Sequence, residues 1–394
     1  MTRVFALLLL VLALSAAPAA RAQLGLPVPQ VPGVGEVVNQ AGQQAGQIGD
    51  QLEQPLQTLR RLQIRELLRE HRRELEADPQ GMPIVRSQIL ALGMSEAAIT
   101  AARAQGFDVV RSDAIDAETA MVTLRAPAGM PTRRALRRLR EADPQGIYDF
   151  DHLHLESGVA LTLTGFAQSG ASNGPRIGLV DSGVSASTPV AAQRAFATEH
   201  PVAGSHGTII AGLISSAAPG ARIYAADIYG GAPTGGASSA LARALGWLAS
   251  ENVAVVNVSL VGPRNRVVEA VVARMVARGF VIVAAVGNDG PAAAPLFPAS
   301  YDGVVGVTAV DAHDRVLVEA GRGAQVDFAA IGVQGRARGT SYAAPIIAAR
   351  LAAQLPAPGA SAAQTALTTM RGDARDLGAR GRDDVYGYGL IAAR

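Results

Sequence analysis

The feature that most constrains the fold of this chain is a series of short, almost purely apolar segments after residue 175. They lie at residues 177–180, 222–228, 253–259, 281–286 and 304–310. Strands that are apolar throughout are buried on both faces, and intervening helices indicate a parallel sheet. Two such helices are predicted at 235–250 and 267–279. We therefore predict an α/β domain with a doubly wound parallel sheet over residues 176–394.

A smaller α+β domain is predicted ahead of it, at residues 81–157. Ser95 and Glu96 are typical of a helix start, and Gly106 of a helix end. The pattern alternates between extended and helical segments: extended at 84–92, 107–115, 119–125 and 147–155, helical at 95–105 and 132–141. This βαββαβ order is that of a ferredoxin-like domain.

Four further segments complete the predicted organisation. Leucines interleaved with arginine and glutamate predict an amphipathic helix within residues 55–80. Residues 23–54, rich in Gly, Gln and Pro, are typical of a flexible spacer, and 158–175 of a linker. Residues 1–22 have the basic start, the apolar run and the small-residue end of a signal peptide.

The signal peptide predicts export to the periplasm or the cell exterior, with cleavage before Gln23. A membrane anchor is the alternative, but the apolar run at 4–14 is short for a span, and Pro18 and Arg21 interrupt its end. Once the signal is removed, we expect no membrane span. Cysteine is absent, which excludes disulfides, a thiol nucleophile and a Cys-zinc site.

Basic residues and histidines outside the motifs suggest little chemistry. Five arginines gather on the helix predicted at 132–141, and we interpret them as a solvated face without nucleic-acid binding: Arg133, Arg134, Arg137, Arg138 and Arg140. His152 and His154 are two apart on a predicted strand and so share a face. A metal site there would need a third ligand, and a pH-sensitive contact is the other possibility.

Four motifs in the predicted α/β domain carry polar groups. Asp181-Ser182-Gly183 follows its first strand, at the edge where such sheets hold their active sites. Ser205-His206-Gly207-Thr208 begins a helix of small residues. Gly287-Asn288-Asp289-Gly290 follows another strand and offers an amide. Gly339-Thr340-Ser341 opens a helix whose next side chains, apart from Tyr342, are small. Each motif taken alone is more often structural than catalytic.

Together and in this order, the motifs resemble the signature segments of the subtilisin-like (S8) serine peptidases. The resemblance covers about residues 172–394 and extends to Val256–Leu260, Phe297–Ala299 and Tyr388–Ile391. The chain order Asp, His, Ser differs from that of chymotrypsin-like proteases and α/β-hydrolases. A G-x-S-x-G elbow around Ser341 is missing, which disfavours an esterase.

The resemblance implies a serine endopeptidase and assigns its residues. Ser341 would be the nucleophile, His206 the general base and acid, and Asp181 the group that orients His206. Asn288 would stabilise the oxyanion. The resemblance also implies that residues 81–157 are an inhibitory, propeptide-like domain. The alternative is a catalytically silent binding or scaffold protein in which that domain stays docked.

The expected partners are a protein or peptide substrate and the chain's own N-terminal domain, in a monomer. No cofactor is expected and no metal ligands are assigned. The resemblance implies no calcium at residues 212–219, which lack the insertion that holds calcium in many relatives, and leaves calcium at other positions open. Ile209 replaces a second histidine of the family motif. The substrate-binding residues implied are Ser259, Leu260, Val261, Gly287 and Leu296. The bulk of Val261 and Leu296 predicts a preference for small side chains before the scissile bond.

Overall fold

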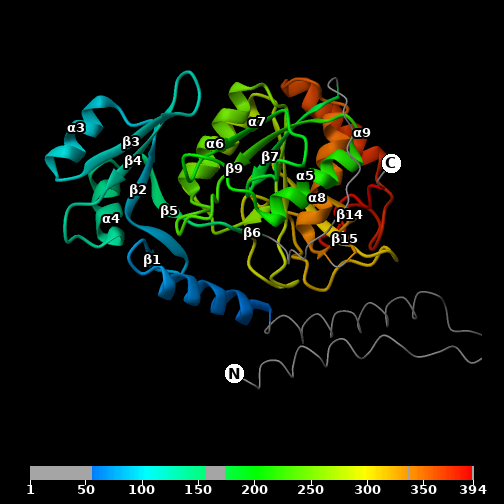
Figure 1. Cartoon of the computed structure of the whole chain (residues 1–394), viewed down its shortest axis with the longest axis horizontal. Helices are drawn as coiled ribbons and strands as arrows, with labels where there is room; N and C mark the ends of the chain where they lie inside the picture. The colour runs from blue at the N-terminus through cyan, green and yellow to red at the C-terminus, as the bar shows by residue number, and fades with distance from the viewer. Residues whose placement is uncertain (1–55, 157–173, 336, 393–394) are drawn as a thin grey trace, which may run out of the picture. The chain divides into compact units, whose positions relative to one another are not determined.

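The computed structural model describes residues 56–156, 174–335 and 337–392 (Figure 1). The predicted signal peptide at 1–22, the spacer at 23–54 and most of the linker at 158–175 lie outside the described residues. Among the described helices, none is long and apolar enough to cross a membrane.

The second part of the chain is built on a seven-stranded sheet with strand order β14-β13-β12-β10-β7-β9-β8. Every neighbouring pair in this sheet is parallel. The strands are β7 (Arg176–Asp181), β8 (Ala192–Ala195), β9 (Arg222–Asp227), β10 (Val255–Val258), β12 (Val281–Ala285), β13 (Val305–Val310) and β14 (Phe328–Ile331). The predicted α/β parallel sheet is confirmed.

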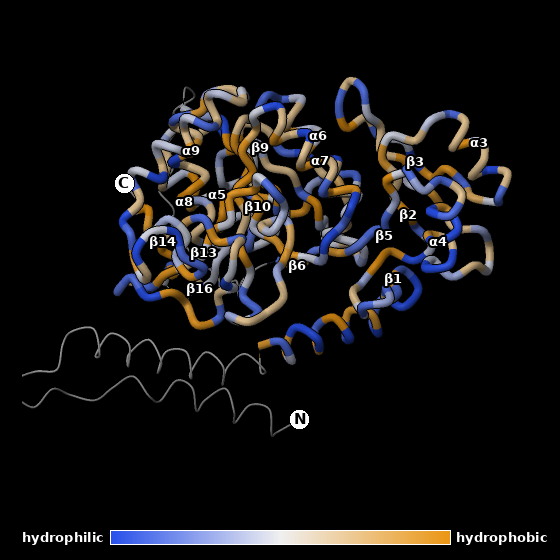
Figure 2. Tube along the Cα trace, turned by 180° about the vertical axis from the view of Figure 1, so that it is seen from behind, coloured by the Kyte–Doolittle hydropathy of each residue, from blue (hydrophilic) through white to orange (hydrophobic). Residues whose placement is uncertain are grey.

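Helices cover both faces of this sheet. Along β7, Ile177 and Leu179 pack with α5 (Ser205–Ala217), α8 (Thr340–Ala352) and α9 (Ala360–Asp373). Val180, which points to the opposite face, packs with α6 (Ser238–Ser250) and α7 (Arg266–Ala277). Figure 2 shows the resulting concentration of hydrophobic residues along the central strands. Burial on both faces explains why these strands have no polar alternation.

The first part of the chain forms an antiparallel sheet with two helices. Its strands are β1 (Leu75–Ala77), β2 (Pro83–Leu92), β3 (Asp108–Ala114), β4 (Ala120–Arg125) and β5 (Ile147–His152), and its helices are α3 (Glu96–Ala104) and α4 (Thr132–Ala142). The strands lie in the order β1-β2-β4-β3, and β5 also pairs with β2. Ile89, Leu124 and Leu136 are in its core.

The helix predicted within residues 55–80 ends earlier than expected. The helix covers residues 56–70, and Leu75–Ala77 form β1 instead. Leu75 lies opposite Val85 and is 1% exposed. Pairing with β2 satisfies backbone hydrogen bonds and buries this leucine. The amphipathic pattern correctly predicts a helix, but its last leucine, Leu75, lies in β1.

The extended segment predicted at 147–155 divides into two strands that join different sheets. β5 ends at His152, and β6 (Leu155–Glu156) pairs antiparallel with β11 (Leu260–Val261) of the second part. Between them, the Leu153 N–H donates to the Pro83 carbonyl and the His154 N–H to the Gly236 carbonyl. A short hairpin, β15 (Val333–Gln334) and β16 (Ala337–Arg338), leads into α8.

Candidate active site

Asp181 and His206 form a fully buried pair at the carboxyl edge of the parallel sheet. Asp181 is the last residue of β7, and His206 lies in the first turn of α5. The His206 Nδ1 atom is 2.9 Å from both carboxylate oxygens of Asp181, and both residues are 0% exposed. Because an ionised carboxylate only accepts, Nδ1 carries the proton in this contact. The carboxylate therefore fixes the ring's orientation and tautomer.

Glycine 207 allows α5 to approach β7 this closely. A Cβ atom on Gly207 would lie 2.0 Å from the Ser182 carbonyl oxygen, a distance that no side chain tolerates. The Gly207 N–H donates to Ser182 Oγ at 3.0 Å. The Ser182 N–H in turn donates to Asp181 Oδ1 at 2.7 Å. The Asp-Ser-Gly and His-Gly motifs are thus joined through their small residues.

Ser341 is brought to the same edge by α8. It lies in the first turn of that helix, after Gly339 with its positive φ of 142°, and it is 0% exposed. Its Oγ donates to the Ser259 carbonyl at 3.4 Å, and the Ser259 hydroxyl donates to the Ser341 carbonyl at 3.2 Å. The neighbouring Tyr342 ring lies edge-on to the His206 ring, 5.8 Å between centroids. The start of α8, which carries Ser341, therefore lies next to His206.

Asn288 follows β12 and is held against the start of α8. The Thr340 N–H donates to Asn288 Oδ1 at 3.0 Å, and the Gly287 N–H donates to Thr340 Oγ1 at 3.2 Å. Because a backbone N–H occupies Oδ1, the amide orientation is fixed and Nδ2 is its donor. A fixed amide donor beside a serine is the arrangement that stabilises an oxyanion.

The predicted substrate-binding residues adjoin this loop. Ser259 and Leu260 are 0% exposed, and Val261 is 1% exposed. Gly287 has a φ of 100°, and a Cβ on it would lie 2.6 Å from Leu296 Cδ1 and 3.6 Å from Val261 Cγ1. The structure thus brings the side chains of Val261 and Leu296 together below Gly287.

The site also contains Glu156, which the sequence reasoning did not identify. β6 places Glu156 opposite Leu260 and Leu155 opposite Val261. One ligand-type atom from each of Glu156, Asp181 and His206 lies within 4.8 Å of the others. Glu156 as a whole residue is exposed, but partial desolvation of its carboxyl group and the nearby Asp181 carboxylate raise the pKa of Glu156. No motif marks this residue, because its position depends on pairing between distant strands.

His154 precedes β6 and is fully buried between two glycines. A Cβ on Gly262 would lie 2.5 Å from the imidazole Cδ2 atom, so only glycine fits there. The Tyr229 hydroxyl donates to the His154 carbonyl at 3.2 Å, and His154 Nδ1 lies 3.2 Å from the Gly236 carbonyl. Burial lowers the pKa of His154 to about 3. This histidine is therefore neutral in the docked strand.

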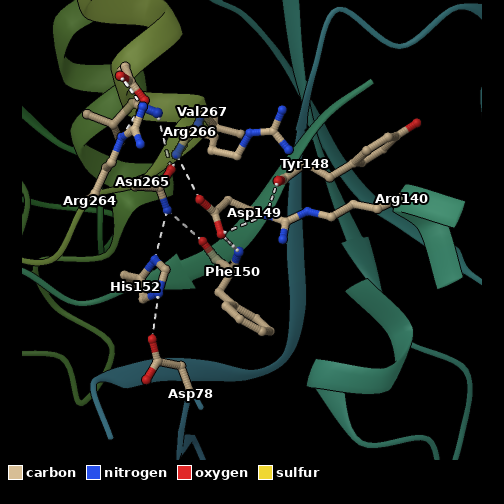
Figure 3. Close-up of polar contacts among 12 residues, drawn as sticks. Asp78, Arg140, Tyr148, Asp149, Phe150, His152, Arg264, Asn265, Arg266 and Val267 are labelled. Carbon is tan, nitrogen blue, oxygen red and sulfur yellow. Dashed lines mark hydrogen bonds and ion pairs between the residues drawn. The ribbon is translucent and has the colours of Figure 1, made fainter. Parts of the chain in front are cut away.

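His152 contacts Asp78 and Asn265, as Figure 3 shows. Its Nε2 is 3.2 Å from Asp78 Oδ2, and its Nδ1 is 3.0 Å from Asn265 Nδ2. Since the Asn265 amide donates, His152 Nδ1 accepts and Nε2 is the protonated atom. Within the described chain, no group of three metal-type ligands includes His152 or His154.

Comparisons with known proteins agree with this geometry. The sequence pattern of the subtilase family, peptidase S8, matches residues 172–389. The minor extracellular protease Epr of Bacillus subtilis is 28% identical over 241 residues, covering 55% of this chain and 37% of Epr. Subtilisin E of Bacillus subtilis is 29% identical over 203 residues, covering 44% of this chain and 53% of subtilisin E. The chain thus spans about a third to a half of these curated relatives.

Solved structures show the same fold at low sequence identity. Fervidolysin from Fervidobacterium pennivorans, described as a keratinolytic enzyme related to subtilisin, has a TM-score of 0.64 at 18% identity, covering 79% of this chain and 60% of fervidolysin. The epidermin leader peptide processing protease of Staphylococcus aureus has a TM-score of 0.58 at 13% identity, covering 78% of this chain and 97% of that protein. With the family pattern matched over the whole parallel-sheet domain, this chain belongs to the subtilase family of serine proteases.

Proposed function

We propose that this chain is an exported serine endopeptidase, made as a precursor whose N-terminal domain occupies its substrate cleft. The observation that carries the proposal is the buried Asp181–His206 pair at the same sheet edge as Ser341 and Asn288. A carboxylate-oriented imidazole beside a serine can activate that hydroxyl. The family membership of the chain supports the same chemistry.

In the proposed mechanism, Ser341 Oγ attacks the peptide carbonyl while His206 accepts its proton. The carbonyl oxygen becomes an oxyanion, which Asn288 Nδ2 and the Ser341 backbone N–H stabilise. His206 then gives the proton to the leaving amine, and the carbonyl carbon stays bonded to Ser341 Oγ as an acyl-enzyme. Water, activated by His206, hydrolyses this ester. Asp181 stabilises the imidazolium throughout and is not itself protonated.

Residues 81–157, interpreted as a ferredoxin-like domain, are proposed to inhibit this site. Two carboxylates of β5 cap helices of the catalytic domain: the Arg266 N–H at the start of α7 donates to Asp149 at 2.7 Å, and the Ser239 N–H at the start of α6 donates to Asp151 at 2.8 Å. Asn265 Nδ2 also donates to the Phe150 carbonyl at 2.8 Å (Figure 3). Helix N-termini favour such negative partners. From this docked surface, β6 continues along β11.

Export is proposed from the signal peptide predicted at 1–22. The similar protease Epr of Bacillus subtilis is described as extracellular, which supports export of this chain. The second candidate function is a catalytically silent scaffold in which the N-terminal domain stays docked. The pairing of β6 with β11 is the observation that favours it.

The test that separates the two candidates is labelling by a fluorophosphonate probe. An active protease binds the probe at Ser341, and its precursor becomes shorter with time. Both events should be absent in Ser341→Ala. A folded wild-type chain that is never labelled and never shortened, even after the N-terminal domain is digested by an added protease, would favour the scaffold.

The primary specificity is proposed to be for small side chains, because Val261 and Leu296 meet below Gly287. A peptide library should be cleaved mainly after Ala, Gly or Ser. Leu296→Ala should shift the preference toward larger apolar residues, since removing a leucine side chain leaves a cavity of its own size. Mass spectrometry of the library products measures both. A wild-type profile dominated by Phe, Tyr or Arg at this position would contradict the proposal.

The raised pKa of Glu156 predicts how docking of β6 depends on pH. A carboxyl group whose pKa is higher in the docked state binds protons on docking, so docking weakens as pH rises through that pKa. His154 acts in the opposite sense, because its pKa falls to about 3 on docking and acid therefore weakens docking. At pH 8 His154 is neutral in both states, and only the Glu156 penalty remains.

Glu156→Gln should therefore hold β6 more tightly at pH 8, and the full-length precursor should gain activity more slowly, by a factor of a few. The difference should shrink as pH falls toward the ordinary pKa of glutamate. The rate of peptide hydrolysis after mixing measures this, with the exposed Glu96→Gln as the control. Faster activation of Glu156→Gln at pH 8 would show that the carboxylate supports docking instead.

A further inference from the structure

The helix at residues 56–70 lies where the two parts of the chain meet. Ile64 is 6% exposed, and Leu67 and Leu68 pack on a small cluster of buried residues: Leu75, Val85, Leu153 and Ala237. Ala237 belongs to the catalytic domain and immediately precedes α6. The apolar side of the helix is thus anchored beside the point where the chain enters β6. Nothing in the proposed mechanism uses this helix.

From the described part of this helix, Arg60 reaches into the catalytic domain. Its Nε lies 3.0 Å from Asp289 Oδ2, and its Nη1 donates to Asp289 Oδ1 at 3.3 Å. Its Nη2 lies 3.5 Å from the Val261 carbonyl oxygen. The two side chains are only 14% and 15% exposed. A two-pronged arginine–carboxylate contact of this kind is both stronger and more directional than a single ion pair.

Both partners of Arg60 belong to the substrate cleft. Val261 is in β11, the strand along which β6 runs and along which a peptide substrate would have to pair. Asp289 directly follows Asn288, the proposed oxyanion donor. The neighbouring Arg61, by contrast, is exposed, and among the described residues its bond is to the Gln57 carbonyl of its own helix, at 3.3 Å. Position 60 is therefore distinguished by what it contacts, not by charge alone.

We propose that Arg60 is a second lock on the active site, which holds the helix at residues 56–70 over the cleft independently of β6. The inference rests on the proposed protease function. Cutting the chain after β6 would leave the helix attached to the N-terminal domain, with Arg60 still bound to Asp289. The β6–β11 pairing and the Arg60–Asp289 contact are both made by the N-terminal domain. While one of them is formed, it keeps the other close to its binding site, so each strengthens the other. The mature enzyme then requires that both be released.

The electrostatics of Asp289 explain why the Arg60–Asp289 contact favours the closed state. Desolvation raises the pKa of Asp289, and Arg60 opposes that rise. A partly buried carboxylate that loses its cation becomes costly in the closed state, so removal of Arg60 favours opening. If the helix leaves, water can replace the Arg60 guanidinium as the partner of the Asp289 carboxylate.

The test uses the full-length precursor and follows the rate at which it becomes accessible to a fluorophosphonate probe. Arg60→Ala should speed this by about tenfold, equivalent to about 1.4 kcal/mol. Arg61→Ala is the matched control and should leave the rate unchanged. Arg60→Asp should also open faster, and adding Asp289→Arg to it should restore slow opening, because the pair is re-formed with reversed charges. Thermal unfolding of each variant checks that the fold is kept.

Two outcomes would overturn the lock: equal rates for Arg60→Ala and Arg61→Ala, or no rescue by the reversed pair. A further variant separates failure of the lock from failure of the proposed function. Leu155→Pro removes a backbone donor from β6 and should release that strand. If Leu155→Pro speeds labelling while Arg60→Ala does not, the proposed protease function is supported and the proposed role of Arg60 is wrong. If no folded variant is ever labelled, the proposed protease function itself fails.

Discussion

Replacing Ser341 by alanine is expected to lower peptide hydrolysis by about 10⁶-fold, the size of loss known for the corresponding serine of subtilisin. Alanine has no group to form the acyl-enzyme, so the peptide bond can be hydrolysed only by direct attack of water, without the covalent intermediate. The remaining rate would come from the oxyanion donors and from substrate binding. Ser341 is fully buried in the first turn of α8, so the smaller side chain should be accepted without rearrangement.

The measurement needs a mature form of a variant that cannot process itself. A trace of wild-type enzyme can cut the Ser341→Ala precursor, and the wild type is then removed by an affinity tag before hydrolysis is assayed. Ser361→Ala, an exposed serine near the start of α9, is the control and should retain full activity. A loss below tenfold in Ser341→Ala would remove this residue from the mechanism.

The parallel sheet could be predicted because each of its central strands is apolar along its whole length. Two outer strands were not predicted from the sequence, β8 (Ala192–Ala195) and β14 (Phe328–Ile331). β8 lies at the sheet edge and none of its residues is fully buried, so its sequence lacks the apolar signal. β14 is apolar and mostly buried, but with only four residues, two of them alanine, it gives too short a pattern to be recognised.

Some residues of the candidate site could be predicted from local sequence patterns, and others could not. Asp181, His206, Asn288 and Ser341 lie within short motifs, where the need for tight turns and small neighbours is local and therefore visible in sequence. Arg60 and Glu156 reach the site from other parts of the chain, Arg60 across 229 positions to Asp289. Their residue types are unremarkable in an amphipathic helix or a strand end. The proposed roles of Arg60 and Glu156 become visible only when the N-terminal part is seen docked on the parallel-sheet domain.

Replacing Asn288 tests a different part of the proposed chemistry, and its two variants separate catalysis from structure. Asn288→Ala removes both the amide donor and the acceptor that holds the Thr340 N–H at 3.0 Å. Asn288→Asp keeps an acceptor for Thr340 and removes the donor. If the donor acts on the oxyanion, both variants lose activity, and the aspartate loses at least as much because its charge opposes the developing oxyanion.

The expected loss in kcat for Asn288→Ala is about 10²–10³-fold, the range known for the oxyanion asparagine of subtilisin. KM should change little, because the donor is used by the oxyanion of the transition state more than by the carbonyl of the substrate. Loss of the Thr340 hydrogen bond should cost about 1 kcal/mol of stability in Asn288→Ala and much less in Asn288→Asp. Steady-state kinetics with a peptide substrate and thermal unfolding measure the two effects. If Asn288→Asp retained wild-type kcat while Asn288→Ala lost it, the role of Asn288 would be to position Thr340 and the start of α8, and the oxyanion would need another donor.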